Sequence, residues 1–391
     1  MESDREPKPD LYPCPPLADV RVVALEQAVS APLCTRHLAD MGADVVKLER
    51  PDGGDFARRY DTVVHGQSAY FVWLNRGKRS VTLDVKAPAD QPLLEALLAR
   101  ADVFVHNLGP GVIDRLGLGW EVLHERWPRL ISCGISGYGS EGPYTHRKAF
   151  DLLVQGESGL PSITGTPEEP VKVGISIADI GAGLYAFSAI LVALYERVHT
   201  GEGRMIDISM LECLAEWMMV PAYYQLYSGA PPARMGMRHN MIVPYGPYRV
   251  GDGSIINLAV QNEGQWRRLC ELVLCRPELA DDPRFRRNHL RLEHREVLEA
   301  MIEESLVGET GESVRARLDV ADVPHGTLND LEGLLAHPQL AARQRWFDIE
   351  SPAGPVRALA HPMNLAGALQ RRAAIPALGE HTEAVRRELG L

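Results

Sequence analysis

Short runs rich in β-branched residues recur through the first third of the chain, and stretches with a helical pattern separate them. One helical stretch, 32–41, is closed by Gly42, and another, 89–100, follows a proline, which is the usual punctuation of helices. Strands that alternate with helices predict βαβ units, so we expect a parallel sheet flanked by helices. The predicted strands are VRVVAL (20–25), DVVKLE (44–49), SVTLDV (80–85), VFVHNL (103–108) and LISCGI (130–135).

The pattern changes near Pro221, where the chain becomes dense in Gly, Pro, Tyr and Arg and loses its helical period. This stretch, 221–253, is typical of a linker. Beyond it, SIINLAV (254–260) predicts a strand, QWRRLCELV (265–273) predicts a helix, and 290–318 is a charged helical stretch. A chain of 391 residues exceeds the usual size of one compact core, and we expect a second, smaller α+β domain here.

The last segment contains another predicted strand around 346–350 and ends in LGEHTEAVRRELGL, which predicts a helix with a capped start. The predicted division is a flexible N-terminus (1–16), a large α/β domain (17–220), a linker with a small α+β domain (221–330), and a return segment (331–391) that completes the large domain.

The formal net charge of -11 argues against a protein that neutralises nucleic-acid phosphates, because that task needs a basic surface. The N-terminus is polar and Pro-rich, without the apolar core of a secretory signal, and no later stretch reads as a membrane span. We expect a cytoplasmic protein. Its six cysteines show no C-x-x-C spacing, and no His pair completes a zinc ligand set, which favours buried free thiols and no metal.

Common nucleotide and hydrolase motifs are missing. The turn after the first strand, EQAVSAP, lacks the G-x-G-x-x-G that brings a backbone against a pyrophosphate, so classical NAD binding is disfavoured. The sequence also contains neither G-x-x-x-x-G-K-[ST] nor G-x-S-x-G, which removes the P-loop and α/β-hydrolase interpretations.

One acidic residue, Asp179, stands just ahead of a long apolar helical stretch whose first turn, with Gly181 and Gly183, is unusually small. A carboxylate in this position can act as a nucleophile toward a thioester, while free helix N–H groups stabilise the oxyanion. The alternative is a helix N-cap, a position that favours Asp for its hydrogen bonds to backbone N–H groups. The residues alone favour the cap.

Two further charged groups have open interpretations. Asp151, in HRKAFDLLVQGESG, either orients a substrate or forms a salt bridge with Lys148. The basic cluster NRGKRS (75–80), together with Lys47, Arg50 and Arg115, either meets nucleotide phosphates or forms a solvated face.

Taken together, several stretches resemble the CaiB/BaiF group, the family III CoA-transferases, from about residue 17 to the C-terminus. The resemblance is carried by an ordered set of motifs: APLCTRHLADMGADVVKLERPDGGD, LNRGKRSVTLDVK, ADVFVHNLGPGVIDRLGLGWEVL, GISGYGSEGPY, AFDLLVQGESG, ADIGAGLYA, HTGEGRMIDISM and LGEHT.

The resemblance implies that Asp179 attacks an acyl-CoA, forms a mixed anhydride and releases CoA thiolate, which then returns. CoA is thus a substrate, and no permanently bound cofactor is expected. The resemblance also implies that Ala28, Val29 and Ser30 contact the thioester end, that Arg50, Lys78, Asn107, Leu108 and Arg115 contact the nucleotide or pantetheine, and that Lys148 contacts a phosphate or the pantetheine arm.

The family also contains α-methylacyl-CoA racemases, which need an acid/base pair to exchange an α-proton. Their motif has His directly before the Asp that matches Asp151, whereas this chain has Phe150, which disfavours a racemase. Glu263 is a further candidate for a racemase carboxylate. A CoA-binding protein without catalytic activity is the remaining alternative.

Family members are implied to form open-ring subunits that interlock as a homodimer. The stretch RHNMIVPYGPYRVGDGSIINLAVQNEGQW resembles members that move CoA from succinyl-CoA to small dicarboxylates such as itaconate, mesaconate or citramalate. A distal carboxylate could be bound by the bidentate fork of an arginine. The candidate residues for this role are Arg58, Arg59, Arg234, Arg238 and His239.

Overall fold

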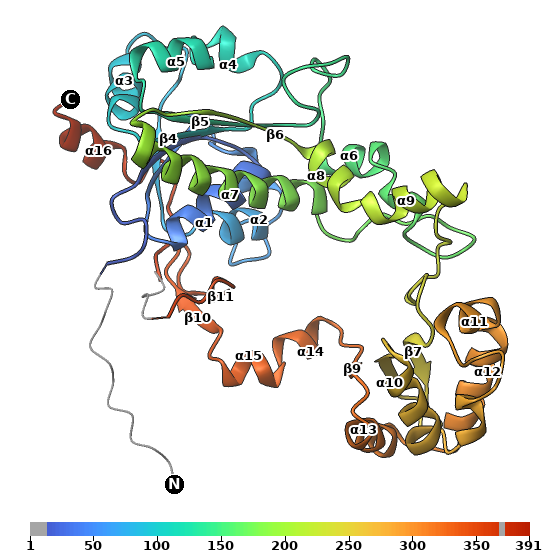
Figure 1. Ribbon diagram of the computed structural model, residues 1–391. Coiled ribbons are helices and arrows are strands. Elements are labelled where there is room, and N and C mark those ends of the chain that lie inside the picture. Colours follow the sequence, from blue (N-terminus) through green and yellow to red (C-terminus); the bar gives the residue numbers. More distant parts are fainter. Residues whose placement is uncertain (1–13, 367–371) are drawn as a thin grey trace. The chain divides into compact units, whose positions relative to one another are not determined.

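The computed structural model describes residues 14–366 and 372–391, so most of the predicted flexible N-terminus lies outside the described residues. Six strands form one parallel sheet in the order β3-β2-β1-β4-β5-β6 (Figure 1). The strands are β1 (Arg21–Leu25), β2 (Asp44–Glu49), β3 (Lys78–Thr82), β4 (Val103–His106), β5 (Ile131–Ser136) and β6 (Met205–Ser209).

The strand order reverses next to β1, because β2 pairs on one side of it and β4 on the other. This is the arrangement of Rossmann-like sheets, in which ligands bind beyond the carboxyl ends of the strands at the point of reversal. The prediction of a parallel sheet flanked by helices is confirmed. Two predicted strands shift: β3 begins two residues early, at Lys78, and β4 ends at His106.

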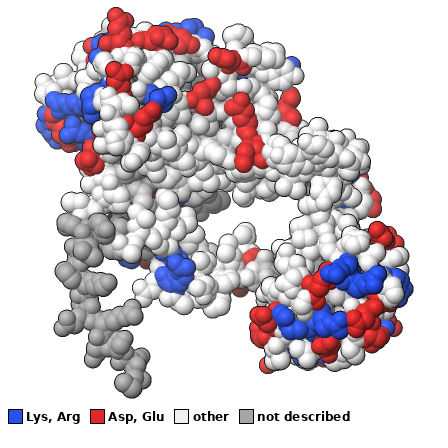
Figure 2. All heavy atoms as spheres, viewed as in Figure 1, with Lys and Arg blue, Asp and Glu red and all other residues white. Residues whose placement is uncertain are grey.

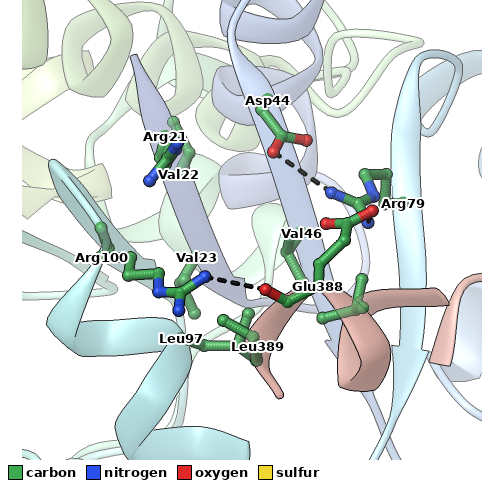
Figure 3. Close-up of a pocket in the computed structure, with 12 residues that line it drawn as sticks. Arg21, Val22, Val23, Asp44, Val46, Arg79, Leu97, Arg100, Glu388 and Leu389 are labelled. Carbon is green, nitrogen blue, oxygen red and sulfur yellow. Dashed lines mark hydrogen bonds and ion pairs between the residues drawn. The ribbon is translucent and has the colours of Figure 1, made fainter. Parts of the chain in front are cut away.

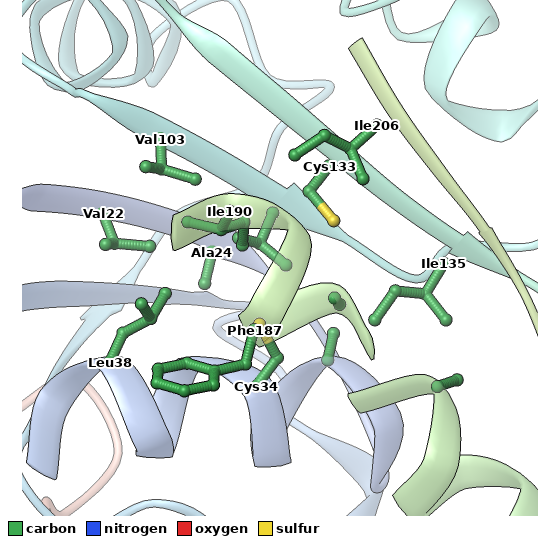
Figure 4. Close-up of a cluster of buried hydrophobic side chains, with 14 of the residues drawn as sticks. Val22, Ala24, Cys34, Leu38, Val103, Cys133, Ile135, Phe187, Ile190 and Ile206 are labelled. Atoms are coloured by element: carbon green, nitrogen blue, oxygen red, sulfur yellow. The ribbon is translucent and has the colours of Figure 1, made fainter. Parts of the chain in front are cut away.

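Helices cover both faces of the sheet. Alternate residues of β1 point to opposite sides, as the period of a strand requires: Val22 and Ala24 pack with α1 (Ser30–Asp40) and α7 (Ile177–Thr200), and Val23 packs with α3 (Gln91–Ala99). Figure 4 shows the first of these clusters, where Leu38, Phe187 and Ile190 meet the strands.

Helix α7 is long and apolar enough to cross a membrane by length and composition, so the prediction that no stretch reads as a span was wrong for this segment. In the structure, Ala182, Ala186 and Ile190 of this helix are fully buried against α1 and the sheet. That position is typical of the core helix of a globular unit.

The chain divides into two compact units, which are described separately. Unit 1 comprises 1–158, 173–218 and 339–391, and unit 2 comprises 159–172 and 219–338. Unit 1 also contains a 3₁₀ helix (Phe56–Arg59), α2 (Ala69–Leu74), α4 (Val112–Arg115), α5 (Trp120–Arg126), α6 (Asp151–Glu157), α8 (Met210–Trp217), the antiparallel pair β10 (Trp346–Ile349) and β11 (Val356–Leu359), and α16 (Thr382–Leu389).

Unit 2 has a three-stranded antiparallel sheet in the order β7-β8-β9, and its core contains Trp266, Phe285 and Leu298. The predicted charged helical stretch 290–318 falls on three helices. The elements are a 3₁₀ helix (Leu160–Ser162), α9 (Met219–Ser228), β7 (Tyr245–Arg249), β8 (Ile255–Ala259), α10 (Glu263–Arg268), a π-helical turn (Leu269–Val273), a 3₁₀ helix (Pro277–Ala280), α11 (Asn288–Glu293), α12 (Arg295–Leu306), α13 (Gly311–Val320), β9 (His325–Thr327) and α14 (Leu331–Leu335), with α15 (Pro338–Ala342) at the boundary.

Two smaller predictions need correction. Helix α16 begins after His381 without a hydrogen bond from a capping side chain, so its start is not capped as predicted. All six cysteines are free thiols, but Cys14 and Cys275 are exposed rather than buried.

Candidate active site

Asp179 lies inside the first turn of α7. The helix begins at Ile177, after Ser176, so the interpretation that Asp179 stands ahead of the helix was wrong, and Asp179 is not the N-cap residue. The N–H groups of Ala178 and Asp179 instead donate to Oδ1 of Asp151, at 2.7 and 3.3 Å. The Asp179 carboxylate is therefore not occupied in capping its own helix.

Asp151 begins α6 and supplies the cap for α7 from outside that helix. Its Oδ2 accepts a hydrogen bond from Nε2 of Gln155 at 2.6 Å, and the buried Gln155 in turn accepts the N–H of Val173 at 2.9 Å. Within the described residues Asp151 forms no ion pair with Lys148, which is exposed. The structure thus favours an orienting role for Asp151 over the salt bridge.

The surroundings of Asp179 change its acidity. Burial and, after it, the negative charge of Asp151 raise the pKa of Asp179 to about 7, although hydrogen bonds from the Ser30 hydroxyl and backbone N–H oppose the shift. A carboxyl group that titrates near neutral pH in such a position is typical of a functional site. Ser30 is the first residue of α1, so the amino ends of two helices meet at this carboxylate.

The loop before α1 is held firmly. Asn107 accepts the N–H of Gln27 at 2.9 Å, donates to its carbonyl oxygen at 2.8 Å and donates to the Ser30 hydroxyl at 3.2 Å. Ala28 has a φ of 61°, the left-handed region that residues with a side chain seldom adopt. Of the loop residues predicted to contact the thioester, Ser30 contacts Asp179, whereas Val29 is buried among Leu33 and other apolar side chains.

The prediction for Lys78 needs correction. Its side chain is fully buried, and its Nζ donates to Oε1 of Glu26 at 2.6 Å, to the carbonyl oxygen of Pro32 at 3.0 Å and to Oδ1 of Asn75 at 3.1 Å. An ammonium group with three internal partners cannot reach a bound nucleotide. Desolvation by this burial lowers the pKa of Lys78 to about 8 even though Glu26 opposes the shift.

A cavity of about 480 Å³ opens at the carboxyl ends of β1 to β4. Arg50 and Leu108, both predicted to contact CoA, line it, and so does Lys86, which the sequence reasoning missed. Lys86 follows a predicted strand directly in LDVK, and this place at the carboxyl edge of the sheet was the available signal. Arg115 is on α4 but does not line the cavity.

Three carboxylates in this cavity already have cationic partners. Glu26 pairs with Lys78, Glu49 pairs with Arg58 at 2.7 Å, and Asp55 pairs with Lys47 at 2.9 Å. Two more, Asp52 and Asp84, are exposed at its rim, where Asp52 lies 3.8 Å from Arg50. The exposed Arg50 and Lys86 are the cationic groups of the lining that a phosphate would meet at this edge.

Two other cavities are poorer candidates. One of about 290 Å³ lies at the amino ends of the strands, the edge opposite Asp179, and its Arg79 and Arg100 already bind Asp44 and Glu388 (Figure 3). The other, of about 430 Å³, lies beside α4 and α5, and its described lining includes Asp114, Glu121 and Asp207 but no lysine or arginine to meet the phosphates of CoA.

A buried group of His37, Asp40 and His361 has side-chain spacing that could hold a metal ion. Asp40, however, already receives two hydrogen bonds of 2.8 Å from the Arg76 guanidinium and pairs with Arg36 at 3.5 Å. Two guanidinium groups beside this cluster disfavour a further cation there.

The arginines predicted to bind a distal carboxylate are engaged elsewhere. Arg58 makes two hydrogen bonds of 2.7 Å to Glu49 and stacks on Phe71, and Arg59 donates to the carbonyl oxygen of Gly53 at 2.8 Å. The Arg58 guanidinium is thus occupied, whereas Arg59 is exposed and makes this one hydrogen bond among the described residues.

The remaining candidates lie in unit 2. Arg238 pairs with Glu299 and Glu303, Arg234 donates to three carbonyl oxygens, His239 stacks on Tyr245, and Glu263 pairs with Arg291 at 2.8 Å. The prediction that Arg238 offers a free fork is therefore wrong, because two carboxylates occupy it.

Three more residues complete the description of unit 1. Phe150 precedes α6 with 67% of its surface exposed. Gly181 faces the Trp217 ring, where a Cβ would lie 2.9 Å from the indole. Tyr60, which the sequence reasoning missed, has its pKa raised to about 12 by burial and by the charges of Asp55 and Asp179, so it remains a neutral hydroxyl near the site.

Comparison with known proteins gives a consistent result. A family model described as CoA-transferase family III matches residues 17–382. The chain is 37% identical over 385 residues to a succinate–glutarate CoA-transferase from Agrobacterium fabrum, with 96% of each chain covered. It is 34% identical over 356 residues to a succinyl-CoA–D-citramalate CoA-transferase from Chloroflexus aurantiacus, covering 90% of this chain and 86% of the relative.

Solved structures include a similar fold. A CaiB/BaiF family protein from Brucella suis has a TM-score of 0.83 and 37% sequence identity, with 96% of this chain and 99% of that chain covered.

Proposed function

Because the chain belongs to CoA-transferase family III, we propose that it moves coenzyme A from succinyl-CoA to a small dicarboxylate through a covalent intermediate on Asp179. The observation that carries this proposal is the environment of Asp179. Its carboxylate lies at the amino ends of α1 and α7, receives hydrogen bonds from Ser30, and is free of a capping role.

The chemistry begins when a carboxylate oxygen of Asp179 attacks the thioester carbonyl carbon. A C–O bond forms, the C–S bond breaks, and CoA leaves as the thiolate, which gives a mixed anhydride. The thiolate then attacks the Asp179 carbonyl carbon of this anhydride, and the donor acid leaves as its carboxylate. An aspartyl–CoA thioester remains.

The acceptor carboxylate attacks this aspartyl thioester, and the same two steps run in reverse order. A second anhydride forms as CoA thiolate leaves, and the thiolate then attacks the acceptor's acyl carbon. The products are the new acyl-CoA and the Asp179 carboxylate. No proton is gained or lost overall, so a carboxylate with helix N–H groups around it suffices for the reaction.

CoA binding is proposed for the cavity at the carboxyl ends of β1 to β4. Arg50 and Lys86 supply cationic groups for the phosphates, and Leu108 supplies an apolar wall. The loop that carries Ala28 and Ser30 lies between this cavity and Asp179, since its neighbours Glu26 and Gln27 line the cavity while Ser30 contacts the carboxylate.

The racemase alternative is disfavoured at Phe150, where an exposed phenyl ring stands in place of a proton-exchanging imidazole. A racemase would return the same CoA ester, and a CoA-binding protein without activity would form no product. Formation of a new CoA ester therefore separates the three functions.

The direct test mixes pure protein and succinyl-CoA with glutarate, citramalate, mesaconate or itaconate and follows CoA esters by mass spectrometry. We expect at least one dicarboxylate to give its CoA ester with an equal amount of succinate. Pentanoate has the length of glutarate without its second carboxylate. It should react at least about tenfold more slowly, because the groups of the site that pair with the second carboxylate would be left without a partner. No CoA ester from any acid would refute the function.

We further propose an interlocked homodimer in the cytoplasm. Within unit 1, Tyr195 and Val198 of α7 are 70% and 79% exposed, and within unit 2, Tyr227 of α9 is 85% exposed. Figure 2 shows dense charged side chains on unit 2 and a broad uncharged area on the part of unit 1 that carries α7. Exposed apolar surface of this kind marks a protein interface.

A second copy of the chain would cover that surface over an area above the ordinary interface of about 1,600 Å². Sedimentation should therefore show a dimer at all dilutions that keep the protein folded. A folded monomer at any concentration would contradict interlocking.

A further inference from the structure

A buried group of charges lies directly beneath the loop that contacts Asp179. Lys47 is fully buried and pairs with Asp55 at 2.9 Å and with Glu26 at 3.3 Å. Lys47 is on β2 and Glu26 follows β1, so the group is fixed to the two strands on one side of the sheet's reversal. Nothing in the proposed chemistry uses these charges directly.

Asp55 connects this group to the loop. One oxygen, Oδ2, accepts from Lys47, while the other, Oδ1, accepts the N–H of Ala28 at 3.1 Å and the N–H of Ala57 at 2.9 Å. The Asp55 N–H is itself held by Glu49 at 3.0 Å. Asp55 is buried, so its contact with Ala28 is protected from competing water.

The contact falls on the one residue of the loop with unusual backbone geometry. Ala28 is held at a φ of 61°, although a residue with a Cβ prefers other conformations. Such a conformation persists only where its surroundings impose it, and it is often found at functional sites. Here Asp55 binds the Ala28 N–H, and Asn107 binds both backbone groups of Gln27.

The backbone conformation of Ala28 affects Ser30, two residues later. Ser30 begins α1, and both its hydroxyl and its N–H donate to Asp179. The direction of these donors depends on how the chain turns at Ala28 and enters the helix. A relaxed Ala28 would turn the Ser30 donors away from the carboxylate.

We propose that the Lys47–Asp55 ion pair and the left-handed Ala28 form a positioning device that aims the Ser30 donors at Asp179. Asp55 and Ala28 act as positioning residues, and the inference rests on the proposed role of Asp179 as nucleophile. A donor set fixed before the substrate arrives needs no rearrangement during the reaction, which is the basis of electrostatic preorganisation.

The test measures acylation of Asp179 by succinyl-CoA alone, through trapping with hydroxylamine and peptide mass mapping, as a function of pH. In Asp55→Asn, an amide N–H₂ facing Lys47 is repelled, so the side chain turns and the bond to Ala28 is lost. We expect the acylation rate to fall at least about tenfold, because small misplacements of reacting groups are costly.

The pH profile gives a second readout that a purely structural role would not change. Hydrogen bonds from Ser30 lower the pKa of Asp179, which stands at about 7 in the intact protein. Their loss should move the acidic limb of the acylation profile to higher pH in Asp55→Asn. Ala28→Gly keeps the hydrogen bond to Asp55 possible, removes only a Cβ that packs at the edge of the Val29, Leu33 and Leu74 cluster, and lets the backbone leave the unusual φ. It should fold and show the same two changes to a smaller extent.

Asp102→Asn is a matched control. Asp102 also joins a cation to a backbone N–H, because it pairs with Arg197 at 2.8 Å and accepts the N–H of Arg21 at 2.8 Å, but at the opposite edge of the sheet. It should lower stability without changing the acylation rate or its pH midpoint.

The possible failures are distinct. A wild-type protein that is not acylated at Asp179 would refute the proposed nucleophile and, with it, this inference. An acylated wild type whose Asp55→Asn and Ala28→Gly variants keep its rate and pH midpoint would overturn the positioning device alone.

Discussion

Asp179→Asn is expected to abolish CoA transfer while the protein stays folded. An amide cannot form the anhydride, and in the described part of the chain no other carboxylate is bonded to Ser30, so the rate should fall at least about a thousandfold, as when other enzymes lose a covalent nucleophile. Transfer from succinyl-CoA to a dicarboxylate is measured by mass spectrometry, with CoA binding followed separately. CoA affinity should change little, because the cavity proposed to bind the phosphates is not lined by Asp179.

The thermal stability of Asp179→Asn distinguishes a nucleophile from a carboxylate that stabilises the fold. Burial raises the pKa of Asp179 from 3.8 to about 7, so the unfolded chain loses this proton more readily than the folded one. Between these two values stability falls as pH rises, and near pH 7 the ionisable group costs up to about 4 kcal/mol. Asp179→Asn should therefore unfold at a higher temperature than wild type at pH 7, with the difference shrinking toward pH 4.

Asp179→Ala gives a second comparison, because an N-cap role would predict that alanine lowers stability by about 1 kcal/mol while asparagine retains activity. Since α7 begins at Ile177 and Asp151 caps it, we expect neither outcome. A freshly prepared Asp179→Asn protein, free of deamidation and still active, would refute the mechanism.

Gly183→Ala is expected to damage both stability and acylation. A Cβ on Gly183 would lie 2.6 Å from the carbonyl oxygen of Ser30 and 3.1 Å from the Cβ of Leu33, so α1 and α7 must separate. Overpacking of this kind costs about 1–3 kcal/mol, and the displaced backbone belongs to the residue that donates to Asp179. Acylation should fall at least about tenfold, measured alongside thermal unfolding.

Gly181→Ala is the matched control, two residues earlier on the same helix. Its Cβ would lie 2.9 Å from the Trp217 ring, which is a side chain with 43% of its surface exposed and can therefore move aside. It should retain most activity and stability. Equal losses in the two variants would show that the close approach to Ser30 has no special role.

Much of the fold is readable from local patterns. The runs around 20–25 and 44–49 form β1 and β2 with little change, because buried parallel strands need continuous β-branched segments whatever their neighbours. The ordered set of motifs along the chain likewise identifies the family, and through that resemblance the nucleophile candidate Asp179, without a structure.

Other features depend on contacts between distant segments. Sequence could not tell that Lys78 would be buried against Glu26, 52 residues earlier, while Lys86 would reach the cavity. Lys78 begins a β-rich segment and Lys86 follows it, and only the packing of β3 beside β2 decides which ammonium meets solvent.

The chemistry of the site also depends in part on the sequence and in part on contacts between distant segments. The sequence by itself determined the parallel sheet, the family motifs and the presence of Asp179, since these rest on local periodicity and residue identity. Only the tertiary structure decided that Asp151 would cap α7, that Ser30 would donate to Asp179 and that Asp55 would hold Ala28, because each contact joins residues at least 27 positions apart. The acidity of a carboxylate depends on its burial and on neighbouring charges, and the folded chain alone sets both.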